Sequence, residues 1–310
     1  MQGKLLIVRW VMFAVAGLGL SAEARAAPPQ LGLPEPEPHT IVGGEVVAEG
    51  EYTEVVALAI EGFACTGVLV SPTLILTAAH CLSNRDPGAL ITIHTGVERG
   101  TMADAQAVDF GAHPDFNANA QASDVLDYGY IVSDRELPGP YAVPITDQEE
   151  FDFAMQWDRE VTIVGYGKFD SAVAEDGTKR ELTVSINGFS PAGLEFFAGG
   201  DGKDSCEGDS GGPVFVTLAD GSRRLAGLIS RGSMVCGSKG IYSVAHEPLC
   251  WVRDASGIDV TGQCGSCDCI DTTPPPEPKE GCGCVTSPRT SGWAWSWALL
   301  LVAARRRREY

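Results

Sequence analysis

Short runs of apolar and β-branched residues recur along the middle of the chain, and Gly, Pro, Asn and Asp separate them. Runs of this length and composition are typical of β-strands, whereas longer stretches with a helical repeat are scarce here. Many short strands with turn residues between them predict an all-β barrel or sandwich. The nine runs are Val55–Ile60, Thr66–Val70, Leu74–Thr77, Leu90–Thr95, Val161–Tyr166, Glu181–Ile186, Pro213–Thr217, Arg224–Ser230 and Gly240–Val244.

The charge of the chain argues against one class of function. Its 310 residues suffice for one large domain or two smaller ones, and 44% of them are apolar, which is enough to fill a core. The formal net charge is −19 at pH 7. Because phosphates attract a basic surface, this charge excludes a general nucleic-acid binder. It is compatible with a soluble extracellular protein.

The first residues have the layout of a secretory signal peptide. Lys4 and Arg9 precede the apolar run Trp10–Leu20, and Ala24–Ala26 then offers a cleavage site with small residues at both ends. We therefore expect a signal peptide at residues 1–26. Export also permits disulfides.

The C-terminal end carries a second pattern. Asp271–Glu280 is rich in Pro and acid, which predicts an extended, uncollapsed linker. After Cys282 and Cys284 come an apolar run, Trp293–Ala304, and four arginines at 305–308. The run is short for a membrane span, which takes about 20 residues. An apolar run that ends in Arg is nevertheless a stop signal whose positive end stays inside.

This C-terminal pattern resembles the Gly-Cys-containing sorting tails of myxobacterial surface proteins, which are processed and exchanged for an anchor on Cys. The resemblance implies a Cys- and Pro-rich linker at residues 265–284 and a sorting tail at 285–310. It also implies that the chain is secreted across the inner membrane and held by the cell envelope, at the cell surface or outer envelope.

Two segments in the first half of the chain offer a base and an acid. In Leu76–Cys81, two Ala let the backbone pack closely while the imidazole of His80 projects outward. In Asp127–Val132, an acid stands at the start of an apolar strand, where a buried carboxylate needs a partner. An imidazole that this carboxylate orients would be such a partner. Asp124 is the rival, and Asp127 is preferred because the apolar strand follows it directly.

The third segment, Asp204–Pro213, offers a nucleophile. Glycines on both sides of Ser210 permit a tight turn in which backbone N–H groups converge. The N–H groups of Gly208 and Ser210 are candidates for an oxyanion hole. Gly-x-Ser-x-Gly also occurs in the nucleophile elbow of α/β-hydrolases, which requires the order Ser, acid, His. Only His246 lies downstream, and the other two candidates precede the serine, so the order excludes that fold.

Together the motifs resemble the trypsin-like serine proteases. The hallmarks are Ile-Val-Gly-Gly at Ile41–Gly44, Thr-Ala-Ala-His-Cys at Thr77–Cys81 and Gly-Asp-Ser-Gly-Gly-Pro at Gly208–Pro213. The resemblance covers residues 41 to about 254 and places the domain at 41–264. It implies two six-stranded antiparallel β-barrels with the active site in the cleft between them.

The resemblance assigns catalytic roles to three residues. Ser210 is the nucleophile, His80 is the general base and then the acid, and Asp127 orients the imidazole. In such a triad the base activates a weak hydroxyl and the carboxylate fixes the tautomer of the base. The competing interpretations are an inactive surface binding or adhesion module on a protease fold, and an esterase with the same triad.

The resemblance also implies a specificity pocket for protein or peptide substrates. Asp204 stands at its floor, Gly232 and Gly240 stand at its walls, and Ser230 aligns the substrate backbone at its entrance. An anionic floor favours Arg or Lys in the substrate. Arg231 stands where relatives commonly carry an aromatic residue, which leaves preferences beyond this pocket open.

Activation by cleavage is a further implication. Ile41 looks like a mature N-terminus, whose freed amine pairs with the carboxylate of Asp209 in this family; a buried ammonium needs such a partner. Residues 27–40 are then a Pro-rich pro-segment. Thr40, not Arg or Lys, precedes the cut, so we expect a different protease to activate the chain.

Ten cysteines in an exported chain indicate disulfides. The resemblance implies the bridges Cys65–Cys81 and Cys206–Cys236, and Cys250 with Cys264 is a further candidate pair. The spacing C-x-x-C-x-C from Cys264 also suits zinc, but no His lies nearby and export favours oxidation. We therefore expect no metal and no other cofactor. The cysteines whose pairing stays open are Cys267, Cys269, Cys282 and Cys284.

Overall fold

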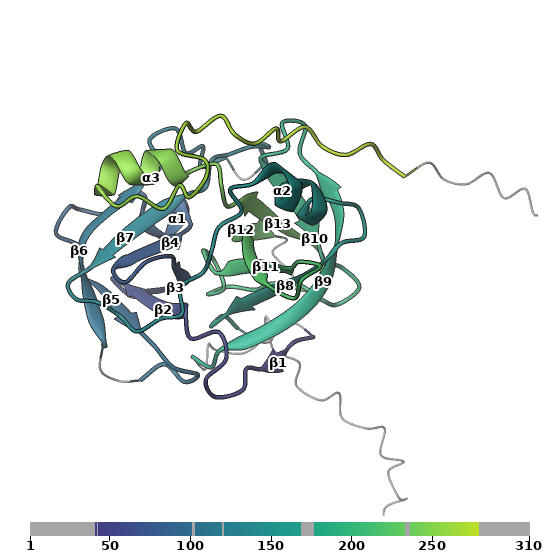
Figure 1. Cartoon of the computed structure of the whole chain (residues 1–310). Coiled ribbons are helices and arrows are strands. Elements are labelled where there is room, and N and C mark those ends of the chain that lie inside the picture. Colours follow the sequence, from purple (N-terminus) through teal and green to yellow (C-terminus); the bar gives the residue numbers. More distant parts are fainter. Residues whose placement is uncertain are drawn as a thin grey trace, which may run out of the picture. The chain divides into compact units, whose positions relative to one another are not determined.

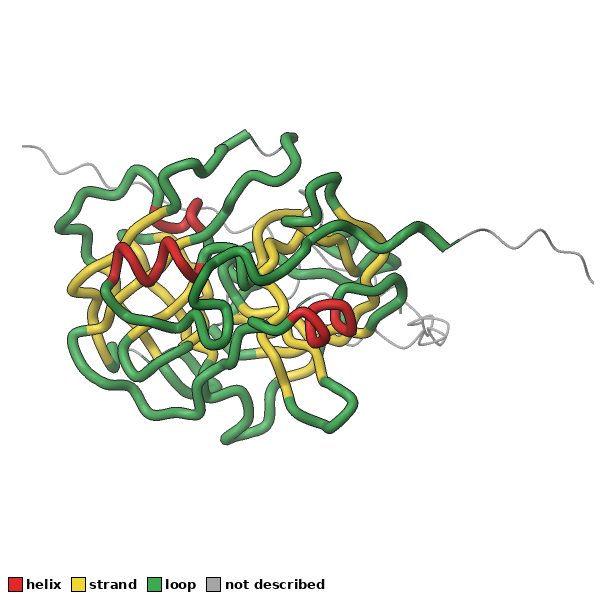
Figure 2. The backbone as a smooth tube through the Cα atoms, turned by 45° about the horizontal axis from the view of Figure 1, so that its top comes forward, coloured by secondary structure: helices red, strands yellow, loops and turns green. Residues whose placement is uncertain are grey.

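The structure is a computed structural model that describes residues 41, 43–100, 103–119, 121–168, 177–232 and 236–278. The expected signal peptide, the pro-segment, the last two cysteines and the sorting tail lie outside the described residues. Strands and their connecting loops make up most of the described chain, together with short helices (Figure 2).

Six antiparallel strands form a first closed barrel (Figure 1). Its strand order is β2-β3-β4-β7-β6-β5, and pairing of β5 with β2 closes it. The strands are β2 (Val55–Ile60), β3 (Phe63–Leu69), β4 (Leu74–Thr77), β5 (Ile91–His94), β6 (Ala105–Ala112) and β7 (Gly129–Ser133).

Six further strands form a second antiparallel barrel, in which β9 pairs with both β8 and β10. A short strand, β1, adds to β9 outside the barrel. The expectation of two six-stranded antiparallel barrels is therefore confirmed. The strands are β1 (Glu45–Val46), β8 (Glu160–Gly165), β9 (Arg180–Phe189), β10 (Glu195–Ala198), β11 (Pro213–Thr217), β12 (Arg223–Gly232) and β13 (Gly240–Val244).

The position of β2 between two apolar clusters explains why its sequence is apolar throughout. Side chains alternate between the two faces of a strand. Val56, Leu58 and Ile60 pack in the core of the first barrel, whereas Val55 and Ala57 belong to a second apolar cluster. That cluster also takes residues from β8, β11 and β12, so it joins the two barrels. Both faces of β2 are buried for this reason.

Three short helices complete the described fold: α1 (Ala79–Leu82), α2 (Gln148–Ala154) and α3 (Leu249–Ser256). The side chain of Asp147 accepts hydrogen bonds from the N–H groups of Glu149 and Glu150, and so caps the start of α2. Within the described ranges, no helix has the length and apolar character needed to cross a membrane.

The segment after α3 lies on the second barrel (Figure 1). Ile270 packs against the core of that barrel. The backbone N–H of Asp271 donates to the side chain of Gln148 at 2.7 Å, and the Trp157 indole N–H donates to the Pro275 carbonyl at 3.2 Å. The expectation of an uncollapsed linker is wrong for residues 271–275, because backbone groups of Asp271 and Pro275 bond to α2 and to the loop that follows it.

Four disulfides are present in the described residues. Cys65–Cys81 and Cys206–Cys236 form as expected. The candidate pair Cys250 with Cys264 is wrong, because Cys250 pairs with Cys267 and Cys264 pairs with Cys269. A turn brings Cys267 back toward α3: its N–H donates to the Cys264 carbonyl at 3.0 Å. Sulfurs joined in this way have no thiolate to offer to zinc.

Candidate active site

His80 lies in α1, immediately after β4, and Asp127 holds it in two places. The backbone N–H of His80 donates to Asp127 Oδ1 at 2.9 Å, and its ring Nδ1 lies 2.8 Å from Asp127 Oδ2. The imidazole is 36% exposed, whereas the carboxylate is almost fully buried. One carboxylate therefore fixes both the position and the orientation of the imidazole.

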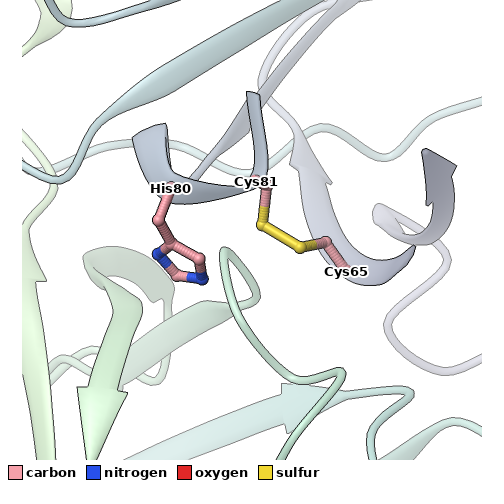
Figure 3. A group of neighbouring side chains, drawn as sticks. All are labelled: Cys65, His80 and Cys81. Atoms are coloured by element: carbon pink, nitrogen blue, oxygen red, sulfur yellow. A yellow bond between two sulfur atoms is a disulfide. The ribbon is translucent and has the colours of Figure 1, made fainter. Parts of the chain in front are cut away.

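The next residue in α1 anchors the helix covalently. Cys81 is joined to Cys65 in β3, and Figure 3 shows the disulfide beside the His80 ring. These three side chains lie close enough together for a metal site. Because the two sulfurs are bonded to each other, they brace the turn that carries His80 rather than offering thiolate ligands.

Asp127 is held in its ionised form. Burial by itself would raise its pKa, but hydrogen bonds from His80 and Ser230 and the charge of His80 outweigh this effect, so the pKa is lowered. The hydroxyl of Ser230 donates to Asp127 Oδ2 at 2.7 Å. A carboxylate in this state can stabilise the positive charge of a protonated imidazole.

Asp124, the rival acid, lies elsewhere. Its carboxylate accepts hydrogen bonds from the hydroxyl of Ser190 and from the N–H of Ala192, at 3.4 Å for the latter. These residues belong to the loop between β9 and β10. The structure thus brings Asp127, and not Asp124, to His80.

Ser210 stands in a tight turn that leads into β11. Gly211 has φ of +80°, and a Cβ atom at this position would lie 2.0 Å from Thr77 Oγ1, so only glycine fits. Thr66 in β3 holds the turn from the first barrel: its N–H donates to the Ser210 carbonyl at 2.8 Å, and its hydroxyl donates to the Gly208 carbonyl at 2.9 Å. The N–H groups of Gly208 and Ser210 donate to no atom of the described residues.

One pocket of about 300 Å³ contains all three candidate catalytic residues. His80 and Asp127 enter it from the first barrel and Ser210 from the second. In the described structure no hydrogen bond joins the Ser210 hydroxyl to His80. Such bonds are often long before a substrate binds, so the geometry is compatible with proton transfer between the two.

Asp204 is buried between the two glycines expected at the pocket walls. A Cβ atom would lie 3.5 Å from its Oδ2 if placed on Gly232, and 2.6 Å from its Oδ1 if placed on Gly240. Larger residues at these positions would therefore cover the carboxylate.

The Asp204 carboxylate accepts only neutral donors among the described residues. The backbone N–H of Ser205 lies 2.7 Å away, that of Lys239 lies 3.1 Å away, and the Tyr242 hydroxyl lies 3.3 Å away. Burial raises the pKa of Asp204, and these hydrogen bonds counteract the rise. A cation that reached this carboxylate would restore the charge balance of the buried site.

Comparison with known protein families places this chain in one of them. The family model described as Trypsin matches residues 41–248, more than half of the chain. The chain belongs to the trypsin family.

Several curated proteins are similar to this trypsin-family chain. It is 29% identical to glucanase inhibitor protein 3 of Phytophthora infestans over 230 residues, which cover 69% of this chain and 87% of that protein. It is 29% identical to phenoloxidase-activating factor 1 of Holotrichia diomphalia over 234 residues, 62% of each chain. It is 26% identical to coagulation factor XII of Bos taurus over 245 residues, covering 69% of this chain. The chain spans less than two thirds of the last two relatives, 62% and 39% of their lengths.

Two contacts of this trypsin-family site were not found by sequence reasoning. Ser230 was expected to align a substrate backbone, and the structure in addition places its hydroxyl on Asp127. Thr66, which holds the serine turn, was not singled out. The sequence did offer one signal for Thr66: it directly follows Cys65, whose expected partner Cys81 is the residue after His80.

The carboxylate of Asp209, directly before Ser210, is fully buried. It accepts hydrogen bonds from the N–H groups of Gly167 and Cys206, each at 2.8 Å. Burial raises its pKa to about 7. The Ile41 side chain is buried in the core of the same barrel.

The pKa of Asp209 predicts how the stability of the unprocessed chain depends on pH. Between 3.8, its ordinary pKa, and about 7, the folded chain keeps a proton that the unfolded chain has lost. The free energy of unfolding therefore falls as the pH rises through this interval, by at most about 1.4 kcal/mol per pH unit from this group. Urea unfolding of the full chain and of Asp209→Asn across the interval measures the effect. Equal pH slopes for the two chains would contradict it.

Proposed function

We propose that this chain is a secreted serine endopeptidase, made as a zymogen, that cleaves peptide bonds after Arg or Lys. The observation that carries the proposal is the single pocket in which the paired His80 and Asp127 meet Ser210. The N–H groups of Gly208 and Ser210, which donate to no atom of the described residues, support the same chemistry, because acyl transfer needs donors for a developing oxyanion.

In this mechanism His80 takes the proton of the Ser210 hydroxyl as the oxygen attacks the substrate carbonyl. Asp127 keeps a proton on Nδ1 of the imidazole, so that Nε2 is the base, and stabilises the imidazolium that forms. The N–H groups of Gly208 and Ser210 bind the oxyanion, a contribution of about 3–4 kcal/mol for each donor. His80 then gives the proton to the leaving amine. Water takes the place of the amine and releases the acid by the same steps.

The proposed preference for Arg or Lys depends on Asp204. Its carboxylate is buried at the wall glycines and has only neutral donors around it in the described structure. A substrate guanidinium or ammonium supplies the missing positive charge, and a guanidinium can bind both oxygens at once.

The proposed zymogen becomes active when another protease cuts before Ile41. The freed ammonium then pairs with Asp209 and lowers its pKa, because an opposite charge favours the ionised carboxylate.

Labelling with a fluorophosphonate probe tests catalysis and activation together. We expect strong labelling of Ser210 after cleavage before Ile41 and little labelling of the unprocessed chain, because the oxyanion site forms fully only in the processed chain. Peptide mapping locates the label. Absence of labelling at Ser210 in the processed chain would refute the catalytic proposal. It would favour the binding-module alternative, to which the similarity to a glucanase inhibitor protein lends some weight.

The proposal also includes export, guided by residues 1–26, and attachment to the cell envelope through the C-terminal tail. Intact-mass analysis of the surface-associated protein is expected to show a shortened, modified C-terminus. Recovery of chains that end at an unmodified Tyr310 would contradict attachment by this route.

A further inference from the structure

A buried ion pair lies beside the pocket that contains Ser210. Glu195, at the start of β10, accepts hydrogen bonds from both terminal nitrogens of Arg231, at 2.7 and 3.1 Å. The Glu195 side chain is 2% exposed and that of Arg231 is 15% exposed. Arg231 follows Ser230 in β12 and lines the same pocket. A two-point contact of this kind fixes the plane of the guanidinium.

The same two side chains hold a segment of the first barrel. Arg231 Nη2 donates to the Ala122 carbonyl at 2.7 Å, and the Val125 N–H donates to Glu195 Oε1 at 3.1 Å. Both backbone groups belong to the connection between β6 and β7. The pair thus joins this connection to two strands of the second barrel.

The held connection forms part of the pocket lining. Phe116, Asn117, Ala118 and Val125 line the pocket together with the candidate triad. The Asn117 N–H donates to the Val125 carbonyl at 2.8 Å, so the two limbs of the connection are tied to each other. A displacement at Val125 is therefore passed directly to the residues that face a substrate.

We propose that Arg231 and Glu195 are a positioning pair that holds residues 116–119 and 121–125 in place as one wall of the substrate cleft. The pair sets how tightly the cleft grips an extended peptide, beyond the single residue in the Asp204 pocket. This inference rests on the proposed function, since it concerns the substrate of the same site. It gives a purpose to Arg231, which stands where an aromatic residue is common among trypsin-like proteases.

A second route from Arg231 must be separated from this one. Its Nη1 also donates to the Ser230 hydroxyl at 3.2 Å, and that hydroxyl donates to Asp127. If this route dominated, loss of the pair would disturb the triad and slow every substrate equally. If the wall dominates, only substrates long enough to touch it are affected.

The test replaces the pair with apolar residues of similar volume, Arg231→Met with Glu195→Leu, because such replacements of buried ion pairs are often neutral for folding. The matched control is Arg224→Met with Glu150→Leu. It removes another partly buried ion pair of β12, from Arg224 to Glu150 in α2, in a part of the chain that does not line the pocket.

Two substrates are compared after processing before Ile41: a blocked single-arginine amide, and a peptide that extends several residues on both sides of the same arginine. For the Arg231/Glu195 variant, kcat/KM of the extended peptide is expected to fall about 10- to 100-fold, mainly through KM, while that of the amide changes less than about threefold. The control variant is expected to match the wild type on both. An equal fall on both substrates, or no fall on either, overturns the inference.

Hydrogen exchange on the full chain gives a readout that does not need activity. The amides of residues 115–119 and 121–126 are expected to exchange faster in the Arg231/Glu195 variant than in the control, while the core strands stay unchanged. Unchanged exchange in these residues overturns the inference. If the wild type cleaved neither substrate, the proposed function would fail, and the exchange result alone would decide the role of the pair.

Discussion

Ser210→Ala is expected to lower kcat by about 10⁶-fold in the processed chain, because in the proposed mechanism this hydroxyl attacks the substrate. The residual rate comes from substrate binding and from the two N–H donors, which the substitution leaves in place. The turn itself should persist, since its glycines are unchanged and Thr66 holds it only through backbone atoms, the carbonyls of Ser210 and Gly208. Steady-state hydrolysis of an arginine peptide measures the effect.

The matched control for this loss is Ser222→Ala. Ser222 lies in the turn between β11 and β12, and its hydroxyl contacts only the side chain of Asp220. This variant is expected to keep the activity of the wild type. Thermal unfolding of both variants shows whether the fold is intact. A Ser210→Ala variant that keeps more than a small fraction of the kcat would mean that another residue performs the attack.

Asp204→Asn is expected to lower kcat/KM for arginine and lysine peptides by roughly 100- to 4000-fold. The substitution keeps the size of the side chain and one acceptor oxygen, but leaves the substrate cation without an anionic partner. Breaking a buried ion pair costs about 3–5 kcal/mol, which corresponds to this range. Hydrolysis of peptides that differ only in having Arg, Lys, Phe or Ala before the cut measures the change.

Asp201→Asn is the control for this second substitution. Asp201 lies three residues earlier in the same connection, but it is exposed to solvent. It should leave the preference among the four peptides unchanged. A wild-type preference for Phe, or an equal loss on all four peptides in Asp204→Asn, would show that Asp204 does not form the specificity floor.

Strands whose residues are buried on both faces could be predicted from their continuous apolar runs. Val55–Ile60 is a continuous apolar run because it packs against both cores, and its predicted bounds match β2. The strand β6 (Ala105–Ala112) was missed because much of it is exposed and polar residues interrupt its apolar ones. β10 was missed because it has only four residues and begins with Glu195.

The site was predictable where chemistry shows in a short stretch of chain. A serine between glycines and an acid at the mouth of an apolar strand both carry such local signals. The contact of Ser230 with Asp127 joins residues 103 positions apart, and Arg231 pairs with Glu195 across 36 positions. In the sequence, these look like ordinary polar residues, because only the fold reveals that they are buried.

The candidate pair Cys250 with Cys264 was wrong for a related reason. Cys250 was assigned to the nearer cysteine, Cys264, whereas the turn at Thr261–Cys267 presents Cys267 to α3 instead. Cys267 has φ of +74°, a left-handed conformation that sequence spacing does not reveal. Connectivity among closely spaced cysteines depends on such local backbone geometry.

The attachment of the segment after α3 determines how the fold responds to a pull on its C-terminal side. It leaves a helix that contacts β6 and β7 of the first barrel, is bridged to that helix through Cys267, and is then bound to the second barrel by Ile270, Asp271 and Pro275. A force that pulls on residue 278 acts first on the weak hydrogen bonds between the segment and the second barrel, and then on the disulfides. We expect the hydrogen bonds to break first, while the disulfides keep the segment attached to α3. A force applied at this end of the described chain therefore acts on the segment and on α3 before it acts on the contacts between the two barrels.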